Sequence, residues 1–224
     1  MKKCIIFDAY GTLISTGSGS SEAAGRIFGK YLPDKSPAEI YAVWKRRHKA
    51  NTAETGTFMT EKDIFILDLR QLFGEYGINA DAEKEVAPML DSLYGRSPFA
   101  ETREVLERLG EKYRIYIGST TDTAPLMSNL DALAFTFDGI YTSEMLRCYK
   151  PQTGFYTELL HRTGFAPEEC WWVGDSYDDD VEGPGAVGIE SFFIDRKGTG
   201  YSGNRCGTMK AVIRDLRELI GYLM

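Results

Sequence analysis

The chain has 224 residues, 43% of them hydrophobic and 26% charged, and a formal net charge of −7. This composition excludes a disordered chain, and the length fits one α/β domain with a small inserted unit. The negative charge and the absence of a long Lys/Arg-rich run favour a small-molecule partner over nucleic acid or an anionic membrane. Because no apolar stretch approaches the length of a membrane span, we expect a cytoplasmic protein.

Cysteine and histidine, the residue types that commonly build zinc and redox sites, are scarce. The four cysteines, which show no paired spacing, are Cys4, Cys148, Cys170 and Cys206. We expect them to be reduced structural thiols. Only two histidines are present, which disfavours a histidine-based metal site or a Ser-His triad. Any bound metal is therefore expected to have carboxylate ligands.

Five short apolar runs have the length of buried strands. They span residues 4–7, 113–117, 139–142, 170–173 and 191–194. Segments with helical apolar spacing separate the later runs, at residues 99–109, 125–133, 153–162 and, more weakly, after Asp178. This alternation predicts an α/β fold with a Rossmann-like parallel sheet core and right-handed crossovers. The tail, residues 209–224, is predicted to be a closing amphipathic helix.

Between the first and second runs the pattern is helical. Amphipathic stretches lie near residues 20–32, 36–51, 60–75 and 81–92. Their predicted core residues are Val43, Trp44, Ile64, Leu67, Leu69, Leu72 and Phe73. We therefore predict a catalytic core formed by residues 1–14 and 95–224, interrupted by an inserted helical domain at residues 15–94.

Polar residues follow the predicted strands at the points where they end. Asp8, Ser119 and Asp175 follow the first, second and fourth runs, and Lys150 follows the third. Each residue alone is explained by a helix cap or a solvated surface position. Caps and surface positions do not explain all four residues together, because the carboxyl ends of parallel strands meet at one edge, where α/β proteins bind ligands. The sequence predicts an active site there.

Four segments in this order resemble the motifs of the haloacid dehalogenase-like superfamily. They are DAYGTL at residues 8–13, ST at 119–120, KP at 150–151 and GDSYDDD at 174–180. The helical stretch after the first motif resembles the inserted cap of that superfamily. The resemblance extends over essentially the whole chain and implies a hydrolase that forms a covalent aspartyl intermediate.

The resemblance also implies roles for individual residues. Asp8 is the expected nucleophile, Thr12 and Ser119 are expected to hydrogen-bond the transferred group, and Lys150 to offset its charge. In the phosphatase branch, Mg²⁺ is expected to bind the Asp8 carboxylate, the Tyr10 carbonyl and Asp175, with Asp180 or its neighbour Asp179 in support. The expected substrate-binding residues are Tyr10, Gly11, Thr120 and Arg46.

The first motif departs from the phosphatase pattern at Tyr10. Phosphatases of the superfamily have an acid/base aspartate there, and a phenol with a pKa near about 10 is a poor substitute. Losing a positioned acid/base typically costs about 10²- to 10⁴-fold in rate. DAYGTL resembles instead the L-2-haloacid dehalogenases, whose halide leaves without a proton. The basic residues after Trp44, beginning with Lys45, approximately match the expected halide-binding position.

The fourth motif points the other way. The metal-free dehalogenases resemble one another in having uncharged residues where this chain has Asp175. Two carboxylates about 4 Å apart repel by roughly 4 kcal/mol at an effective dielectric of about 20, which favours a bound cation such as Mg²⁺. We therefore predict a Mg²⁺-dependent phosphatase-like hydrolase acting on a small phosphorylated metabolite. The alternatives are a metal-independent 2-haloacid dehalogenase and a weakly active regulatory or binding protein.

Overall fold

The computed structural model describes residues 1–53, 56–198 and 207–224. Its centre is a six-stranded parallel sheet in the order β3-β2-β1-β4-β5-β6. The strands are β1 (Cys4–Phe7), β2 (Arg114–Ser119), β3 (Gly139–Thr142), β4 (Cys170–Gly174), β5 (Glu190–Ile194) and β6 (Met209–Ile213). The predicted parallel α/β core is confirmed, and all five expected strands are present.

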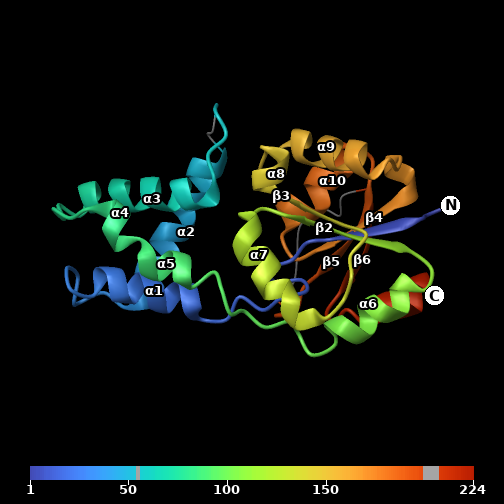
Figure 1. Cartoon of the computed structure of the whole chain (residues 1–224), viewed down its shortest axis with the longest axis horizontal. Helices are drawn as coiled ribbons and strands as arrows, with labels where there is room; N and C mark the ends of the chain where they lie inside the picture. Colours follow the sequence, from blue (N-terminus) through green and yellow to red (C-terminus); the bar gives the residue numbers. More distant parts are fainter. Residues whose placement is uncertain (54–55, 199–206) are drawn as a thin grey trace.

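Helices cover both faces of the sheet (Figure 1). One face packs against α6 (Thr102–Gly110), α7 (Thr123–Leu130) and α11 (Glu218–Leu223). The other packs against α9 (Thr153–Thr163), with α8 (Ser143–Leu146) and α10 (Gly183–Ala186) on the same side. Side chains of β1 alternate between the two cores, Ile5 and Phe7 in one and Cys4 and Ile6 in the other. Both faces are thus buried, as the continuous apolar runs require.

Single helical turns complete the connections of the sheet. They span Asp131–Leu133 after α7, Pro167–Glu169 before β4 and Asp178–Glu182 after β4, the last being a π-helical turn.

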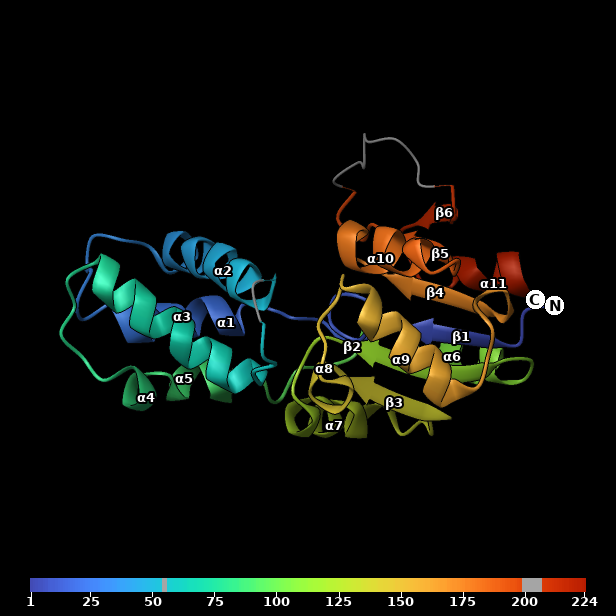
Figure 2. The ribbon, with the colours of Figure 1, turned by 90° about the horizontal axis from the view of Figure 1, so that it is seen from above.

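Of the six helices described between β1 and β2, all but α6 pack into a unit beside the sheet (Figures 1 and 2). They are α1 (Gly19–Phe28), α2 (Pro37–Ala53), α3 (Glu61–Glu75), α4 (Ala82–Glu85) and α5 (Ala87–Asp91). We call this unit the helical insertion. Trp44, Leu69, Leu72 and Phe73 lie in its core as expected, whereas Leu67 is only partly buried.

The prediction for the tail was wrong. Residues 209–213 form β6 at the edge of the sheet, and only Glu218–Leu223 is helical. Met209, Ala211 and Ile213 are buried while Lys210 between them is exposed. This is the two-residue period of a strand with one buried face.

The three cysteines within the described residues occupy interior or partly buried positions. Cys4 and Cys170 are opposite each other on β1 and β4, with their sulfur atoms 3.0 Å apart. Both are free thiols, as is Cys148. Cys206 lies outside the described residues. No helix in the described ranges is long and apolar enough to cross a membrane.

Leu69→Ala tests the independent core of the helical insertion. Leu69 is fully buried, so its truncation is expected to lower the free energy of unfolding by about 2 to 5 kcal/mol through lost burial and the resulting cavity. Urea denaturation measures the loss. Arg70→Ala, at the exposed neighbouring position, is the matched control. Equal stability of the two variants would contradict the packing described here.

Candidate active site

The ends of β1, β2 and β4 bring the predicted site residues to one edge of the sheet. Asp8 directly follows β1, Ser119 is the last residue of β2, and Asp175 directly follows β4. Because β1 lies between β2 and β4, these three positions are neighbours. They line a cavity of about 680 Å³, which Tyr10, Thr120, Lys150 and Asp180 also line. The sheet edge thus gathers most of the predicted set.

Lys150 is the buried centre of the site. Its ammonium group donates hydrogen bonds of 2.8 Å to Oδ1 of Asp8 and 2.8 Å to Oδ1 of Asp180. The lysine and Asp180 side chains are each 1% exposed. Asp180 also accepts hydrogen bonds from the Trp172 indole and the Ser176 backbone N–H. These contacts fix Asp180 and Lys150 relative to the expected nucleophile.

Asp175 adds a third carboxylate to those of Asp8 and Asp180. Oxygen atoms of Asp8, Asp175 and Asp180 all lie within 4.8 Å of one another. Gly11, with φ +92°, makes room for Asp175, because a Cβ atom at this position would overlap its carboxylate. Gly174 likewise makes room for Asp180. Both glycines permit the close approach of the acidic side chains.

The donor set fits a hard divalent cation. Three carboxylates and one ammonium leave two negative charges when all are ionised. Oδ2 of Asp8 is buried and has no hydrogen-bond partner among the described residues. Burial raises the pKa of Asp8, and the Lys150 ammonium group opposes that shift. A second cation would therefore further favour the ionised nucleophile. Oxygen ligands of this kind suit Mg²⁺.

Tyr10 occupies the usual acid/base position in a mostly buried environment. Asn129 donates a 2.9 Å hydrogen bond to its hydroxyl, and the Arg96 guanidinium lies over its ring, 4.8 Å from the centroid. Burial raises the pKa of Tyr10 further above the ordinary value of a phenol. The tyrosine is therefore unsuited to serve as a base near neutral pH.

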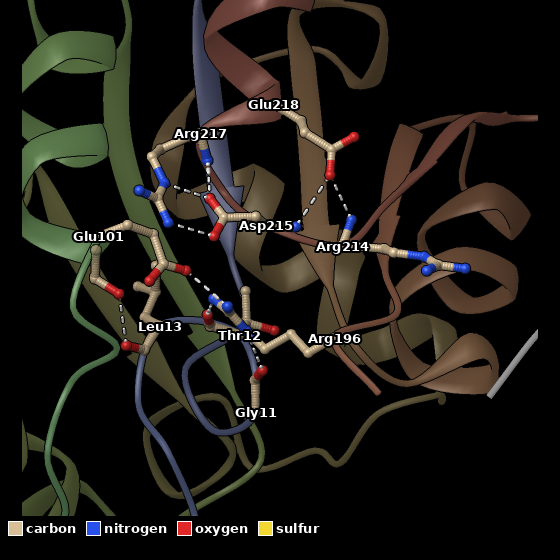
Figure 3. Close-up of polar contacts among 10 residues, drawn as sticks. Gly11, Thr12, Leu13, Glu101, Arg196, Arg214, Asp215, Arg217 and Glu218 are labelled. Carbon is tan, nitrogen blue, oxygen red and sulfur yellow. Dashed lines mark hydrogen bonds and ion pairs between the residues drawn. The ribbon is translucent and has the colours of Figure 1, made fainter. Parts of the chain in front are cut away.

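Arg196 anchors the loop that follows the nucleophile (Figure 3). It donates hydrogen bonds to the carbonyls of Gly11 and Thr12 and pairs with the carboxylate of Glu101 at 2.6 Å. The Thr12 side chain is completely buried, and neither Gly11 nor Thr12 lines the cavity. In the structure, Gly11 and Thr12 therefore support the loop through the hydrogen bonds that their carbonyls accept from Arg196. A direct contact of either residue with substrate stays a prediction.

The helical insertion closes the other side of the cavity. Tyr41, Lys45, His48, Lys49 and Thr52 line it from α2. Their spacing of three or four residues places them on one helix face. Arg46, expected to bind substrate, is out of phase with this face, is exposed and does not line the cavity. Its predicted role has no support in this geometry.

Reciprocal contacts join the helical insertion to the core beside the site. Glu61 accepts hydrogen bonds from the Thr121 hydroxyl and the Asp122 backbone N–H. In return, Asp122 accepts hydrogen bonds from the backbone N–H groups of Glu61 and Lys62, at the start of α3. Lys49 pairs with Asp178 at 2.6 Å. The sequence interpretation missed Glu61, whose position at a helix start resembled an ordinary cap.

A protein-family model described as haloacid dehalogenase-like hydrolase matches residues 2–188. The chain belongs to this family. Haloacid dehalogenase-like hydrolase domain-containing protein 3 of Mus musculus is 32% identical over 121 residues, 49% of this chain and 47% of its own length. This chain thus aligns with about half of the mouse protein.

Two relatives match most of this hydrolase. (S)-2-haloacid dehalogenase 4A of Burkholderia cepacia is 26% identical, covering 88% of this chain and 84% of its own. Ribulose-1,5-bisphosphate 5-phosphatase of Halopiger xanaduensis is 24% identical, covering 87% and 85%. The relatives therefore include both a dehalogenase and a phosphatase.

Solved structures share the fold of this hydrolase. L-2-haloacid dehalogenase from Xanthobacter autotrophicus superposes with a TM-score of 0.79 at 21% identity, covering 98% of this chain and 97% of that one. A HAD-hydrolase of Bacillus subtilis, YfnB, bound to magnesium, gives 0.76 at 20% identity, covering 99% and 98%. At this level of identity the likeness establishes the fold alone.

Arg196→Ala tests the support of the nucleophile loop. The substitution leaves the buried Glu101 carboxylate without its ion-pair partner and is expected to lower the free energy of unfolding by about 3 kcal/mol. Arg217→Ala is the matched control, because Arg217 forms a solvent-exposed pair with Asp215 (Figure 3). Urea denaturation of both variants gives the comparison. Equal losses of unfolding free energy in the two variants would show that Arg196 does not stabilise the loop.

Proposed function

We propose that this hydrolase is a Mg²⁺-dependent phosphatase that acts on a small phosphorylated substrate through a phosphoryl-Asp8 intermediate. The observation that carries the proposal is the convergence of Asp8, Asp175 and Asp180 around a single buried lysine. Lys150 offsets one of the three negative charges. A phosphate dianion entering this site would face strong repulsion unless a divalent cation offset the remaining charge.

Asp8, Asp175 and the Tyr10 carbonyl would hold the ion, with Asp180 supporting from its buried position. When bound, Mg²⁺ would offset phosphate charge and orient the phosphoryl group. Asp180 is proposed over Asp179 because its carboxylate belongs to the cluster, whereas Asp179 contacts Tyr156 through its backbone carbonyl.

The proposed chemistry uses the two oxygens of Asp8 differently. One oxygen would take part in cation binding while the other attacks phosphorus, and Lys150 holds the carboxylate in position. Ser119 and Thr120, at the end of β2, lie in the cavity where their hydroxyls would hydrogen-bond the phosphoryl oxygens. The helical insertion, acting as a cap, would exclude bulk water from this step.

The second candidate function is metal-independent 2-haloacid dehalogenation. Tyr10 favours it, because a departing halide needs no proton from the acid/base position. The Burkholderia relative, a haloacid dehalogenase matched over most of both chains, supports it as well. Under this candidate, Lys45 from α2 would face the leaving halide within the cavity. The uncompensated carboxylates weigh against it.

Asp8→Asn tests both candidates at the shared step. Removing the nucleophilic carboxylate is expected to lower the turnover of phosphate esters with Mg²⁺ by on the order of 10⁴-fold or more. Phosphate release across a panel of phosphorylated metabolites is the measurement. Asp178→Asn, an acid of the same motif that pairs with Lys49 outside the cluster, is the control and is expected to retain activity.

The choice between phosphatase and dehalogenase needs one further comparison. Halide release from 2-chloro- and 2-bromo-acids in the presence of a chelator, without phosphate ester turnover in Mg²⁺, would contradict the proposal and favour the dehalogenase. Binding of a ligand or partner without any turnover would favour a regulatory protein.

A further inference from the structure

His48 is held in one orientation by a buried carboxylate of the helical insertion. Its Nδ1 atom lies 2.7 Å from Oδ2 of Asp68, a side chain with no solvent exposure. An ionised carboxylate next to Nδ1 makes that nitrogen the N–H donor and leaves the lone pair on Nε2. The Phe65 ring stacks on the imidazole, with centroids 4.5 Å apart and planes at 22°. Orientation and tautomer are both restricted.

Asp68 is itself fixed by two other side chains of α2. The Trp44 indole donates to Oδ2 at 3.1 Å and the Asn51 amide to Oδ1 at 2.6 Å. Trp44, His48 and Asn51 therefore share one buried acceptor on α3. This network ties α2 to α3, which accounts for the tryptophan and the asparagine. It does not account for a histidine whose ring also reaches the active-site cavity.

His48 is also part of the active-site cavity. His48 lines it together with Asp8, and its side chain is 23% exposed although Nδ1 is turned to Asp68. No hydrogen bond to Nε2 is formed within the described part of the chain. Glu61 lines the same cavity; burial raises its pKa, and the nearby His48 opposes that shift. The carboxylates of Asp68 and Glu61 thus both lie near the imidazole.

We propose that His48, oriented by Asp68, is the general base of this hydrolase and takes the acid/base role for which Tyr10 is unsuited. The proposal rests on the proposed function. Nε2 removes a proton from the water that attacks phosphorus in phosphoryl-Asp8. The new P–O bond forms as the P–O bond to Asp8 breaks, and the electron pair returns to the Asp8 carboxylate. The imidazolium then protonates the leaving group of the next substrate.

The test uses p-nitrophenyl phosphate, whose leaving group departs as a stable anion without a proton. His48→Gln is expected to release about one p-nitrophenol per enzyme in a rapid burst. Turnover then continues at a steady-state rate about 10² to 10⁴-fold below wild type, because the intermediate forms normally but is hydrolysed slowly without the base. Asp68→Asn is expected to lower that steady-state rate about 10- to 100-fold, also with a burst. A purely structural role would reduce both phases together.

Three comparisons make the result decisive. His161→Gln, at the other histidine of the chain, is 84% exposed and is expected to behave as wild type. Imidazole added to His48→Ala is expected to restore part of the steady-state rate. A burst in Glu61→Gln with none in His48→Gln would assign the base to Glu61 and overturn the proposal, as would unchanged kinetics in His48→Gln. No turnover by wild type would instead contradict the proposed function beneath it.

Discussion

The buried contact between Lys150 and its two carboxylate partners organises the site. Asp8 comes from the end of β1, Asp180 from the turn after β4, and Lys150 from the segment between α8 and α9. Burying these charges is costly, and the cost is offset only when each has partners. The Trp172 and Ser176 donors provide them for Asp180. The geometry of the nucleophile thus depends on three segments that are distant in sequence.

The charge balance of this cluster decides between the candidate activities. A single lysine cannot compensate three carboxylates together with an anionic substrate, and the buried Oδ2 of Asp8 has no partner in the described chain. Both facts favour a divalent cation bound at the three carboxylates. The first motif, in contrast, contains a tyrosine that is poorly suited to proton transfer. The two observations are compatible if the acid/base group comes from the helical insertion, whose α2 face lines the same cavity.

Much of the fold was predictable because its signals are local. Strands buried on both faces are short continuous apolar runs, and the polar residue at the end of each run identifies the ligand-binding edge. Asp8, Ser119 and Asp175 were found in this way. The tail was misassigned because residues 209–224 were interpreted as one amphipathic helix, although β6 alternates with a period of two. Short segments of this kind support either reading.

The missed parts of the site depend on tertiary contacts. Arg46 and Lys45 are adjacent in a basic run, and only the packing of α2 shows that Lys45 belongs to the cavity face. His48 and Asp68 are twenty residues apart on different helices, so their contact has no sequence signature. Arg196 supports the loop of Gly11 and Thr12 from the far end of the chain. Pairings of this kind become visible only once the elements are packed.

A crystal structure grown with Mg²⁺ and fluoroberyllate, a mimic of the phosphoryl group, tests metal-assisted phosphoryl transfer to Asp8. We expect the mimic on one oxygen of Asp8 and the ion bound by Asp8 and Asp175, with Lys150 still in contact with Asp8. A structure with no ion at Asp8 and Asp175, in which Lys150 alone balances the carboxylates, would contradict phosphoryl transfer at this site.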